Sequence, residues 1–176
     1  DKETSTTNDV MFEVTSDVGS DENIVWQILA NGDYEYDGTG STPASDIAEM
    51  YPVAEEEEEE MEVGDVVSLK EEKMANESNS SYTIRRSQEA YDPNVIGVIS
   101  TKPALLMGRD TEGGLPVALL GRVPTKVSLE NGPIHKGDFL TPSSTPGYAM
   151  KASQPGMVIG RALEDFDGTE DDKDID

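Results

Sequence analysis

The chain has 176 residues and carries 37 aspartates and glutamates against 13 lysines and arginines, a formal net charge of −24 at pH 7. This excess argues against nucleic acids or anionic membranes as partners, because phosphate contacts need clustered lysine and arginine. The chain has no cysteine, so disulfides and thiolate chemistry are excluded. No apolar run approaches the roughly 20 residues that span a bilayer, so we expect no membrane insertion.

The acidic residues are unevenly distributed. Two segments, Glu55–Glu60 and Asp165–Asp176, carry much of the negative charge. Like charges packed this densely repel one another and stay solvated, so we expect both segments to be exposed. Asp165–Glu170 resembles the start of a calcium loop, but the glycine required at the sixth position is absent. We therefore expect an acidic tail over residues 165–176 and no metal site.

Residues 1–43 have the pattern of a short, strand-rich, fibre-like segment. Strands are predicted over Met11–Val14 and Ile24–Tyr36, and Asn31-Gly32 interrupts the second of them. Asn-Gly is the strongest short-range signal for a β-hairpin. Two or three small strands cannot bury much surface alone. The segment therefore needs neighbours, either the following domain or identical chains.

Aromatic residues alternate along the predicted hairpin. Trp26, Tyr34 and Tyr36 fit either the packed face of a trimeric or sandwich core or a sugar-binding surface, and a packed face is the more common arrangement. Three copies around one axis would cover the open strand edges. Such a homotrimer would bury the apolar side chains of Phe12, Val14, Val25 and Ile28.

Residues 44–164 have the pattern of a compact all-β domain. Short, β-branched apolar runs are separated by Gly-Asp, Asn-Gly, Pro and Gly-Gly at intervals of about ten residues. No helical period persists over three turns, although Ala48–Met50 could add one helical turn. Lys70–Ser81 is expected to be an exposed loop or hairpin tip. The apolar runs are Val63–Leu69, Val95–Ile99, Leu115–Leu120, Val123–Val127, Phe139-Leu140 and Met157–Leu163.

One pattern occurs twice in this domain. Val63–Ser68, with the sequence VGDVVS, recurs as Lys136–Thr141, with the sequence KGDFLT. Each copy is followed by a similar strand, Val95–Val98 and Val158–Arg161. Gly-Asp supplies a turn, because glycine tolerates positive φ and aspartate bonds to nearby backbone. The repeat suggests a pseudo-symmetric small β-barrel or β-clip, with chance similarity between two turns as the alternative.

The bond between Ser45 and Asp46 is the candidate for chemistry. A serine hydroxyl can attack the neighbouring carbonyl when a base accepts its proton. Asp46 and Glu49 are close enough in sequence to act as that base. The more common role of Ser-Asp followed by Glu is a helix N-cap with its capping interaction, and both alternatives stay open. The single histidine, His135, lacks a cysteine or second histidine for a zinc site.

Several motifs together resemble one known family. Gln27–Gly38 followed by Ala44–Tyr51 is similar to a junction of phage tail and neck-appendage proteins, in which a strand–Asn-Gly–strand unit leads into a C-terminal domain. The runs Val95–Ser100, Gly121–Pro124 and Gly137–Leu140 are similar to the same family, the peptidase G2 type of autoproteolytic intramolecular chaperone. The resemblance covers roughly residues 25–164.

The resemblance implies a role for each residue of the junction. Ser45-Asp46 would be the scissile bond, and Glu49 would be the nearby carboxylate that assists proton transfer. It also implies that the domain nucleates a homotrimer and sets the register of the three chains. Similar domains also end long bacterial surface proteins.

We therefore expect an all-β structural component of a phage tail fibre, spike or appendage, whose C-terminal domain promotes homotrimer assembly. Its partners would be copies of itself and a host-surface receptor, and it would need no cofactor. Its location would be the virion tail or the cell surface. Two alternatives remain: an enzyme that acts once on itself at Ser45-Asp46, and an adhesion module of a bacterial surface protein that binds carbohydrate or calcium.

Overall fold

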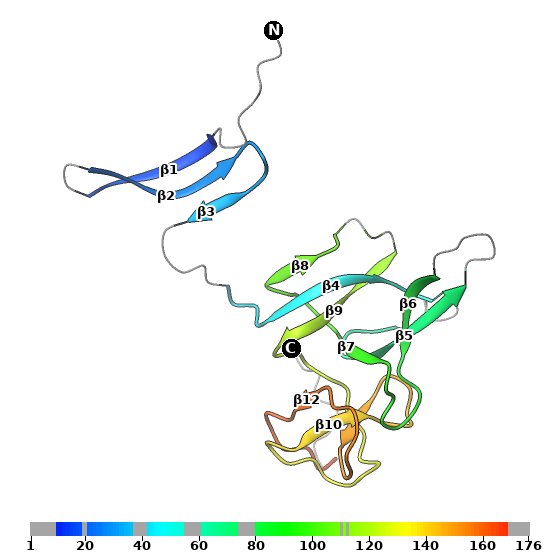
Figure 1. Ribbon diagram of the computed structural model, residues 1–176. Coiled ribbons are helices and arrows are strands. Elements are labelled where there is room, and N and C mark those ends of the chain that lie inside the picture. The colour runs from blue at the N-terminus through cyan, green and yellow to red at the C-terminus, as the bar shows by residue number, and fades with distance from the viewer. Residues whose placement is uncertain are drawn as a thin grey trace. The chain divides into compact units, whose positions relative to one another are not determined.

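The computed structural model describes residues 10–18, 21–36, 42–54, 61–73, 80–109, 111 and 113–168. No helix occurs among these residues, and their regular elements are strands, which confirms the all-β class (Figure 1). The chain divides into two compact units, Asp1–Thr42 and Pro43–Asp176. The Glu55–Glu60 run lies outside the described residues.

The first unit is a three-stranded antiparallel sheet in the order β1-β2-β3. The strands are β1 (Val10–Val18), β2 (Asp21–Leu29) and β3 (Tyr34–Tyr36). The predicted Asn31-Gly32 hairpin is confirmed: the Gly32 N–H donates to the Leu29 carbonyl at 2.9 Å, and Gly32 has a φ of +90°. Glycine adopts such a φ without the steric cost that a Cβ brings.

The second unit is built on a six-stranded sheet in the order β6-β5-β7-β9-β4-β8. Only β4 and β8 are parallel neighbours. The sheet curls until Val53, just after β4, forms an isolated parallel bridge with Ile84 of β6 (Figure 1). The predicted barrel-like curl is thus present. The strands are β4 (Asp46–Pro52), β5 (Val66–Lys73), β6 (Ser80–Arg86), β7 (Val95–Ile99), β8 (Leu105–Met107) and β9 (Gly114–Gly121).

A smaller antiparallel sheet completes the second unit. Its order is β11-β10-β12, with β10 at Phe139–Pro142, β11 at Ala149–Lys151 and β12 at Gly160–Arg161. Phe166 exchanges two backbone hydrogen bonds of 2.9 Å with Ile134. The folded part therefore continues into the stretch that was expected to begin the acidic tail at Asp165.

Two hydrophobic clusters hold the second unit together. Successive side chains of a strand leave opposite faces, so the neighbours Val66 and Val67 enter different clusters. One contains Val66, Val98 and Leu140 and joins the large sheet to the small one. The other contains Val67, Ile84, Ile99 and Val117. The centre of the large sheet is thus buried on both faces.

The sequence repeat forms the same backbone structure twice. Val66 pairs with Val98 and Val67 with Gly97, while Phe139 pairs with Arg161 and Leu140 with Gly160. These four pairs occupy equivalent positions of the two copies. Both turns also share their hydrogen bonds. The Gly64 N–H donates to Ile99 at 2.9 Å, and the Gly137 N–H donates to Ala162 at 2.8 Å. The repeat is therefore a structural motif and not a chance similarity.

The two turn aspartates, Asp65 and Asp138, have the same kinds of partner: one backbone N–H and one lysine. The Asp65 carboxylate accepts the Glu62 N–H at 2.9 Å, and the Asp138 carboxylate accepts the His135 N–H at 2.8 Å. A lysine then pairs with each aspartate, at 2.7 Å from Lys126 to Asp65 and at 2.8 Å from Lys151 to Asp138.

The two lysine pairs differ in burial. The Asp65 side chain is 2% exposed, whereas that of Asp138 is 25% exposed. Burial alone lowers the pKa of Lys126, but the hydrogen bonds and charges of Asp65 and Glu62 outweigh it, so that pKa is raised. The hydrogen bond and charge of Lys126 lower the pKa of Glu62. The Lys151 hydrogen bond, followed by the His135 N–H, lowers the pKa of Asp138.

Several expected boundaries differ from the structure. Ala48–Met50 is not helical but lies within β4, because pairing with β9 on one side and β8 on the other overrides any local helical preference. Val123–Val127 forms only an isolated bridge at Val127, since Pro124 cannot donate to a ladder. Strand pairing extends into Lys70–Ser81 from both ends, over Lys70–Lys73 and Ser80-Ser81.

Candidate functional site

The Ser45–Asp46 junction is held against the end of β9. The backbone N–H of Arg122 donates to the Ser45 carbonyl at 3.0 Å, and the Arg122 guanidinium donates to Ser45 Oγ at 3.1 Å. Asp46 is buried, and its carboxylate accepts a hydrogen bond from Ser100 Oγ at 2.6 Å. The junction is therefore fixed on both sides of the peptide bond.

Gly121 permits this close approach. It has a φ of +124°, and a Cβ built there would lie against the Ser45 carbonyl and 2.6 Å from the Cα of Asp46. A larger residue would push β9 away from the junction. In the sequence, only the family resemblance points to Gly121 and Arg122, and no local pattern around Ser100 indicates its contact with Asp46.

Glu49 lies apart from the junction. It is three residues beyond Asp46, so the two side chains leave opposite faces of β4. Four residues of extended chain separate Ser45 from Glu49, a span of roughly 13 Å. The Glu49 carboxylate instead accepts a hydrogen bond from the Tyr51 hydroxyl at 3.2 Å. Burial, followed by the charge and hydrogen bond of Glu49, raises the pKa of Tyr51.

These positions define what the junction can do chemically. The Arg122 N–H polarises the Ser45 carbonyl, but Ser45 Oγ accepts a hydrogen bond and, among the described residues, donates none to a carboxylate. A serine acts as a nucleophile only when a base takes its proton. The structure thus brings Ser45 and Asp46 to one place without Glu49.

The two faces of the first unit carry different side chains. Cross-strand partners lie on the same face of a sheet, and the register pairs Ile28 with both Phe12 and Tyr34. Trp26 lies on this face too, and its ring meets the edge of the Phe12 ring at a centroid distance of 5.6 Å. We call this surface, made of Phe12, Trp26, Ile28 and Tyr34, the aromatic face.

The opposite face carries a polar row, in which the register aligns Glu13, Gln27 and Glu35, and the Gln27 amide donates to the Glu35 carboxylate at 2.6 Å. The pair Val10 and Leu29 lies on this face too.

No second layer covers the aromatic face among the described residues of the first unit. Phe12 is 53% exposed and Tyr34 is 62% exposed. Leu29 is the only buried side chain described in this unit. Trp26 and Tyr34 of the alternating aromatic pattern therefore share one face, and the described residues of a single copy leave Phe12 and Tyr34 more than half exposed there. The side chains of Val14, Val25 and Tyr36 lie outside the described ones.

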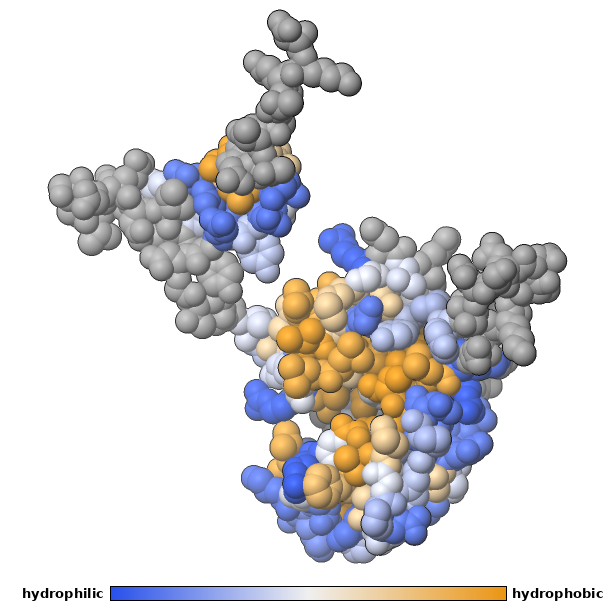
Figure 2. Space-filling model, viewed as in Figure 1, coloured by the Kyte–Doolittle hydropathy of each residue, from blue (hydrophilic) through white to orange (hydrophobic). Residues whose placement is uncertain are grey.

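A second apolar surface lies at the edge of the large sheet. The three residues of β8, Leu105, Leu106 and Met107, are between 36% and 48% exposed, and we call them the β8 ridge. Among the strands that the structure describes, β8 pairs only with β4 and forms the edge of the sheet. Figure 2 shows apolar side chains gathered over this part of the second unit. The sequence does not predict β8, because three apolar residues are too few for a periodic pattern.

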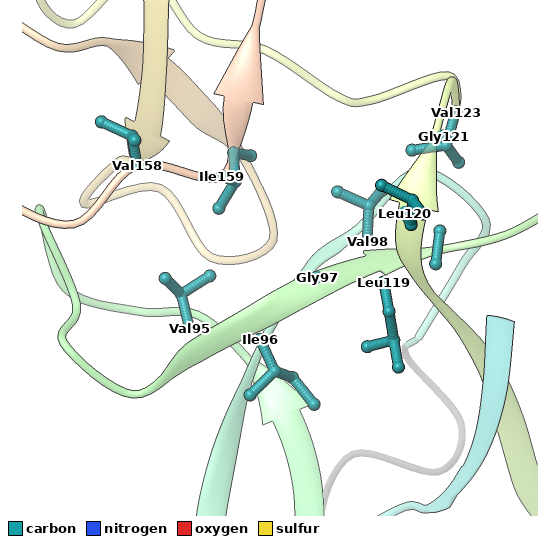
Figure 3. A pocket seen from close by; sticks show the side chains of 11 residues that line it. Val95, Ile96, Gly97, Val98, Leu119, Leu120, Gly121, Val123, Val158 and Ile159 are labelled. Carbon is teal, nitrogen blue, oxygen red and sulfur yellow. The ribbon is translucent and has the colours of Figure 1, made fainter. Parts of the chain in front are cut away.

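A groove of about 360 Å³ opens between β7, the end of β9 and the segment that leads into β12. The described residues that line it are glycines or have apolar side chains, and polar backbone atoms are exposed along it as well. Figure 3 shows Val95 and Val98 on one wall and Val158 and Ile159 on another, with Leu120 beside them. The second copy of the sequence repeat thus supplies one wall and the first copy supplies another.

The ridge and the groove come from stretches without acidic residues. Residues 93–109, 113–129 and 139–163 contain no aspartate or glutamate, although the chain carries 37 of them. In the first two stretches lie Lys102, Arg109 and Arg122. Within the part of the chain that the structure describes, none of these three forms an ion pair.

The described residues contain no cluster of three histidine, aspartate or glutamate side chains suited to a metal ion. The ring of His135 lies 3.8 Å from the Asp165 carboxylate, and both side chains are largely exposed. No helix long and apolar enough to cross a membrane occurs among the described residues.

Comparison with known proteins adds no assignment. No family model, no curated protein and no solved structure matches the chain.

Proposed function

We propose that the chain is a structural component of a phage tail fibre, spike or appendage, and that its second unit promotes assembly of a homotrimer. The observation that carries this proposal is the open aromatic face of the first unit. The resemblance of residues 25–164 to the intramolecular chaperone family supplies the trimeric state and the setting, a virion tail or a cell surface.

The aromatic face favours self-association on energetic grounds. Burying a large apolar side chain contributes about 1.5–3 kcal/mol, and Phe12 and Tyr34 are each more than half exposed. Exposed apolar patches on soluble proteins mark interaction surfaces. Other copies of the chain are always present wherever this sheet is present, which favours them as its partners.

The second unit is suited to lead the assembly. It has two buried clusters of its own, so it does not depend on neighbours for a core. Bringing three chains together and ordering them costs conformational entropy. A folded unit that associates first lowers that cost for the thin sheet at the other end of the chain.

Light scattering during size-exclusion chromatography of the full chain tests the proposal. We expect three times the mass of one chain. Phe12→Asp should lower the mass, because it places a charge on the aromatic face. Glu13→Gln is the matched control, since the neighbouring residue lies on the polar face, and it should leave the mass unchanged. A single-chain mass for the unaltered protein would contradict the proposal.

Self-cleavage at Ser45-Asp46 is the second candidate. The donation of the Arg122 N–H to the Ser45 carbonyl favours it, because this contact polarises the bond that would break. Intact-mass spectrometry after long incubation tests it. A fragment that begins at Asp46 and disappears in Ser45→Ala would support cleavage. A single intact species would exclude it and leave the structural proposal untouched.

A further inference from the structure

We propose that residues 152–159 form a movable strap, that Tyr91 holds it closed, and that its release opens the groove of the second unit. The strap connects β11 to β12, the two outer strands of the small sheet. Its last two residues, Val158 and Ile159, form one wall of the groove (Figure 3). Such a motion takes place within one copy of the second unit, so it is independent of the proposed self-association.

Tyr91 has a strained backbone. It occupies the third position of a β-turn that the Asp92 N–H closes by donating to the Glu89 carbonyl at 3.1 Å. Its φ is +60°, and glycines are the only other described residues with a positive φ. The Cβ makes this conformation costly, which is why glycine or asparagine usually occupies such a position. A residue stays strained only where its surroundings compensate for the strain. The Tyr91 side chain therefore has to make contacts that offset it.

Those contacts are made with the strap. The Ser153 N–H donates to the Tyr91 hydroxyl oxygen at 2.8 Å, and Ser153 Oγ lies 3.2 Å from the same oxygen. The Ser153 hydroxyl, followed by the backbone N–H groups of Ser153 and Gln154, lowers the pKa of Tyr91. The ring lies against Gly156, where an added Cβ would be 2.7 Å from Tyr91 Cδ1. One side chain thus contacts the strap at both of its exposed turns of chain, near its start and near its end.

The middle of the strap depends on Tyr91. Both ends of the strap are bonded to β10, through the N–H groups of Ala152 at 2.8 Å and Ile159 at 2.9 Å. Between them, the hydrogen bonds that residues 153–156 form with the described chain all go to Tyr91. Residues 153–158 are exposed. Segments with exposed backbone bonds and few buried side chains open at a lower free energy than the core does.

The strain at Tyr91 and its contacts act in opposite directions. The hydrogen bonds and the ring contact favour the closed strap, whereas relief of the backbone strain favours release. The two states are therefore closer in free energy than the contacts alone would make them, and such a pair of states is easily shifted.

Release of the strap would change the groove. Ile159 packs against the hydrophobic cluster that contains Val95, Val98 and Leu140, and Val95 and Val98 also line the groove. When Val158 and Ile159 move away with the strap, the groove widens and this apolar surface becomes accessible. The closed strap thus limits access to a surface that the second unit otherwise buries.

Hydrogen exchange of the full chain, followed by NMR, tests the proposal with Tyr91→Phe. This variant keeps the ring on Gly156 and removes the hydroxyl acceptor. We expect the amides of Ser153 and Ile159 to exchange about tenfold faster, as removal of one hydrogen bond implies, and by the same factor. The amides of Ala149 and Ala162, which donate to backbone carbonyls outside the strap, should be unchanged.

Tyr82→Phe is the matched control. Tyr82 lies on β6 and is 53% exposed, so loss of its hydroxyl should leave all four amides unchanged. Binding of the apolar dye 8-anilinonaphthalene-1-sulfonate provides a second readout, because an open groove exposes apolar surface. Dye fluorescence should rise in Tyr91→Phe and stay unchanged in Tyr82→Phe.

Three results would overturn the proposal. Faster exchange at Ser153 alone would show that the wall of the groove does not move with the middle of the strap. Equal acceleration at Ala149 and Ala162 would show that Tyr91 stabilises the whole unit and not a separate strap. Unchanged dye fluorescence in Tyr91→Phe would show that the groove does not open.

Discussion

The two Gly-Asp turns of the second unit have equivalent hydrogen bonds but different surroundings. In the first copy Val66 and Val67 are both fully buried, whereas the equivalent Phe139 is 45% exposed. The first copy lies inside the large sheet, and the second lies in the small sheet and supplies a wall of the groove. Local sequence therefore determines the turn and the strand register, while the surrounding elements determine how much each copy contributes to stability.

The largest contrast is expected at the equivalent glycines Gly97 and Gly160. A Cβ at Gly97 would lie against the Ala118 carbonyl and 2.7 Å from Val117 Cγ1, whereas a Cβ at Gly160 would meet nothing within 4 Å. Gly97→Ala should lower the free energy of unfolding by about 3 kcal/mol, since overpacking a tight core forces the backbone to shift. Gly160→Ala should change it by less than about 0.5 kcal/mol. Urea unfolding of both variants measures the difference, and equal losses would refute the contrast.

Substitution of the turn lysines should show the same contrast, with a larger loss of stability in the first copy than in the second. Lys126→Met leaves the buried Asp65 carboxylate without its cation and should cost about 2 kcal/mol, less than a fully buried pair because Lys126 is partly hydrated. Lys151→Met removes the cation from the more exposed Asp138 and should give little change in the urea midpoint. A larger effect for Lys151→Met would show that burial does not distinguish the two pairs.

The glycines of the turns themselves should behave alike. Gly64 and Gly137 have φ values of +85° and +92°, so each disfavours a residue with a Cβ. The Cβ of Gly64→Ala would make only an ordinary contact, 3.5 Å from Lys126 Cγ, and that of Gly137→Ala would meet nothing within 4 Å. Both substitutions should therefore cost about 1 kcal/mol. Thermal melting of the pair checks this, and unequal losses would show that the two backbones differ.

The smallest effects are expected in the titration of the turn carboxylates. The pKa of Glu62 is lowered from 4.5 by Lys126, and the pKa of Asp138 is lowered from 3.8 by Lys151. A carboxylate with a lowered pKa stabilises the fold above its unfolded pKa, and that contribution is lost as the pH falls through the folded value. Carboxyl NMR titration should show the pKa of Glu62 rising in Lys126→Met while that of Asp138 stays unchanged. The reverse is expected in Lys151→Met.

The parts of the fold that the sequence predicts are those with local causes. The Asn31-Gly32 hairpin and both Gly-Asp turns follow from residues that adopt their conformations without neighbours. The equivalence of the two copies was visible because the whole turn and the strand that follows it are repeated. The strand at Ala48–Met50 could not be predicted, because it forms only when β8 and β9 pair with it.

The candidate site was predictable only in part. Ser45 and Asp46 are adjacent in the chain, so they lie close together whatever the fold. Arg122 and Ser100 reach them from distant segments, and a contact of that kind leaves no local pattern. The alternation along β4 also separates Glu49 from Asp46, which proximity in sequence alone does not reveal. The β8 ridge could not be predicted, because only the folded structure shows that its three apolar side chains are exposed.

Trp26 allows the most direct measurement of self-association. It is the only tryptophan in the chain and lies on the aromatic face, so its fluorescence reports whether another copy covers that face. At concentrations where light scattering gives a trimer, we expect the short-wavelength emission of a buried indole. On dilution the emission should shift to longer wavelength in step with the fall in mass. Long-wavelength emission that stays constant while the protein is trimeric would contradict coverage of the aromatic face by a second copy.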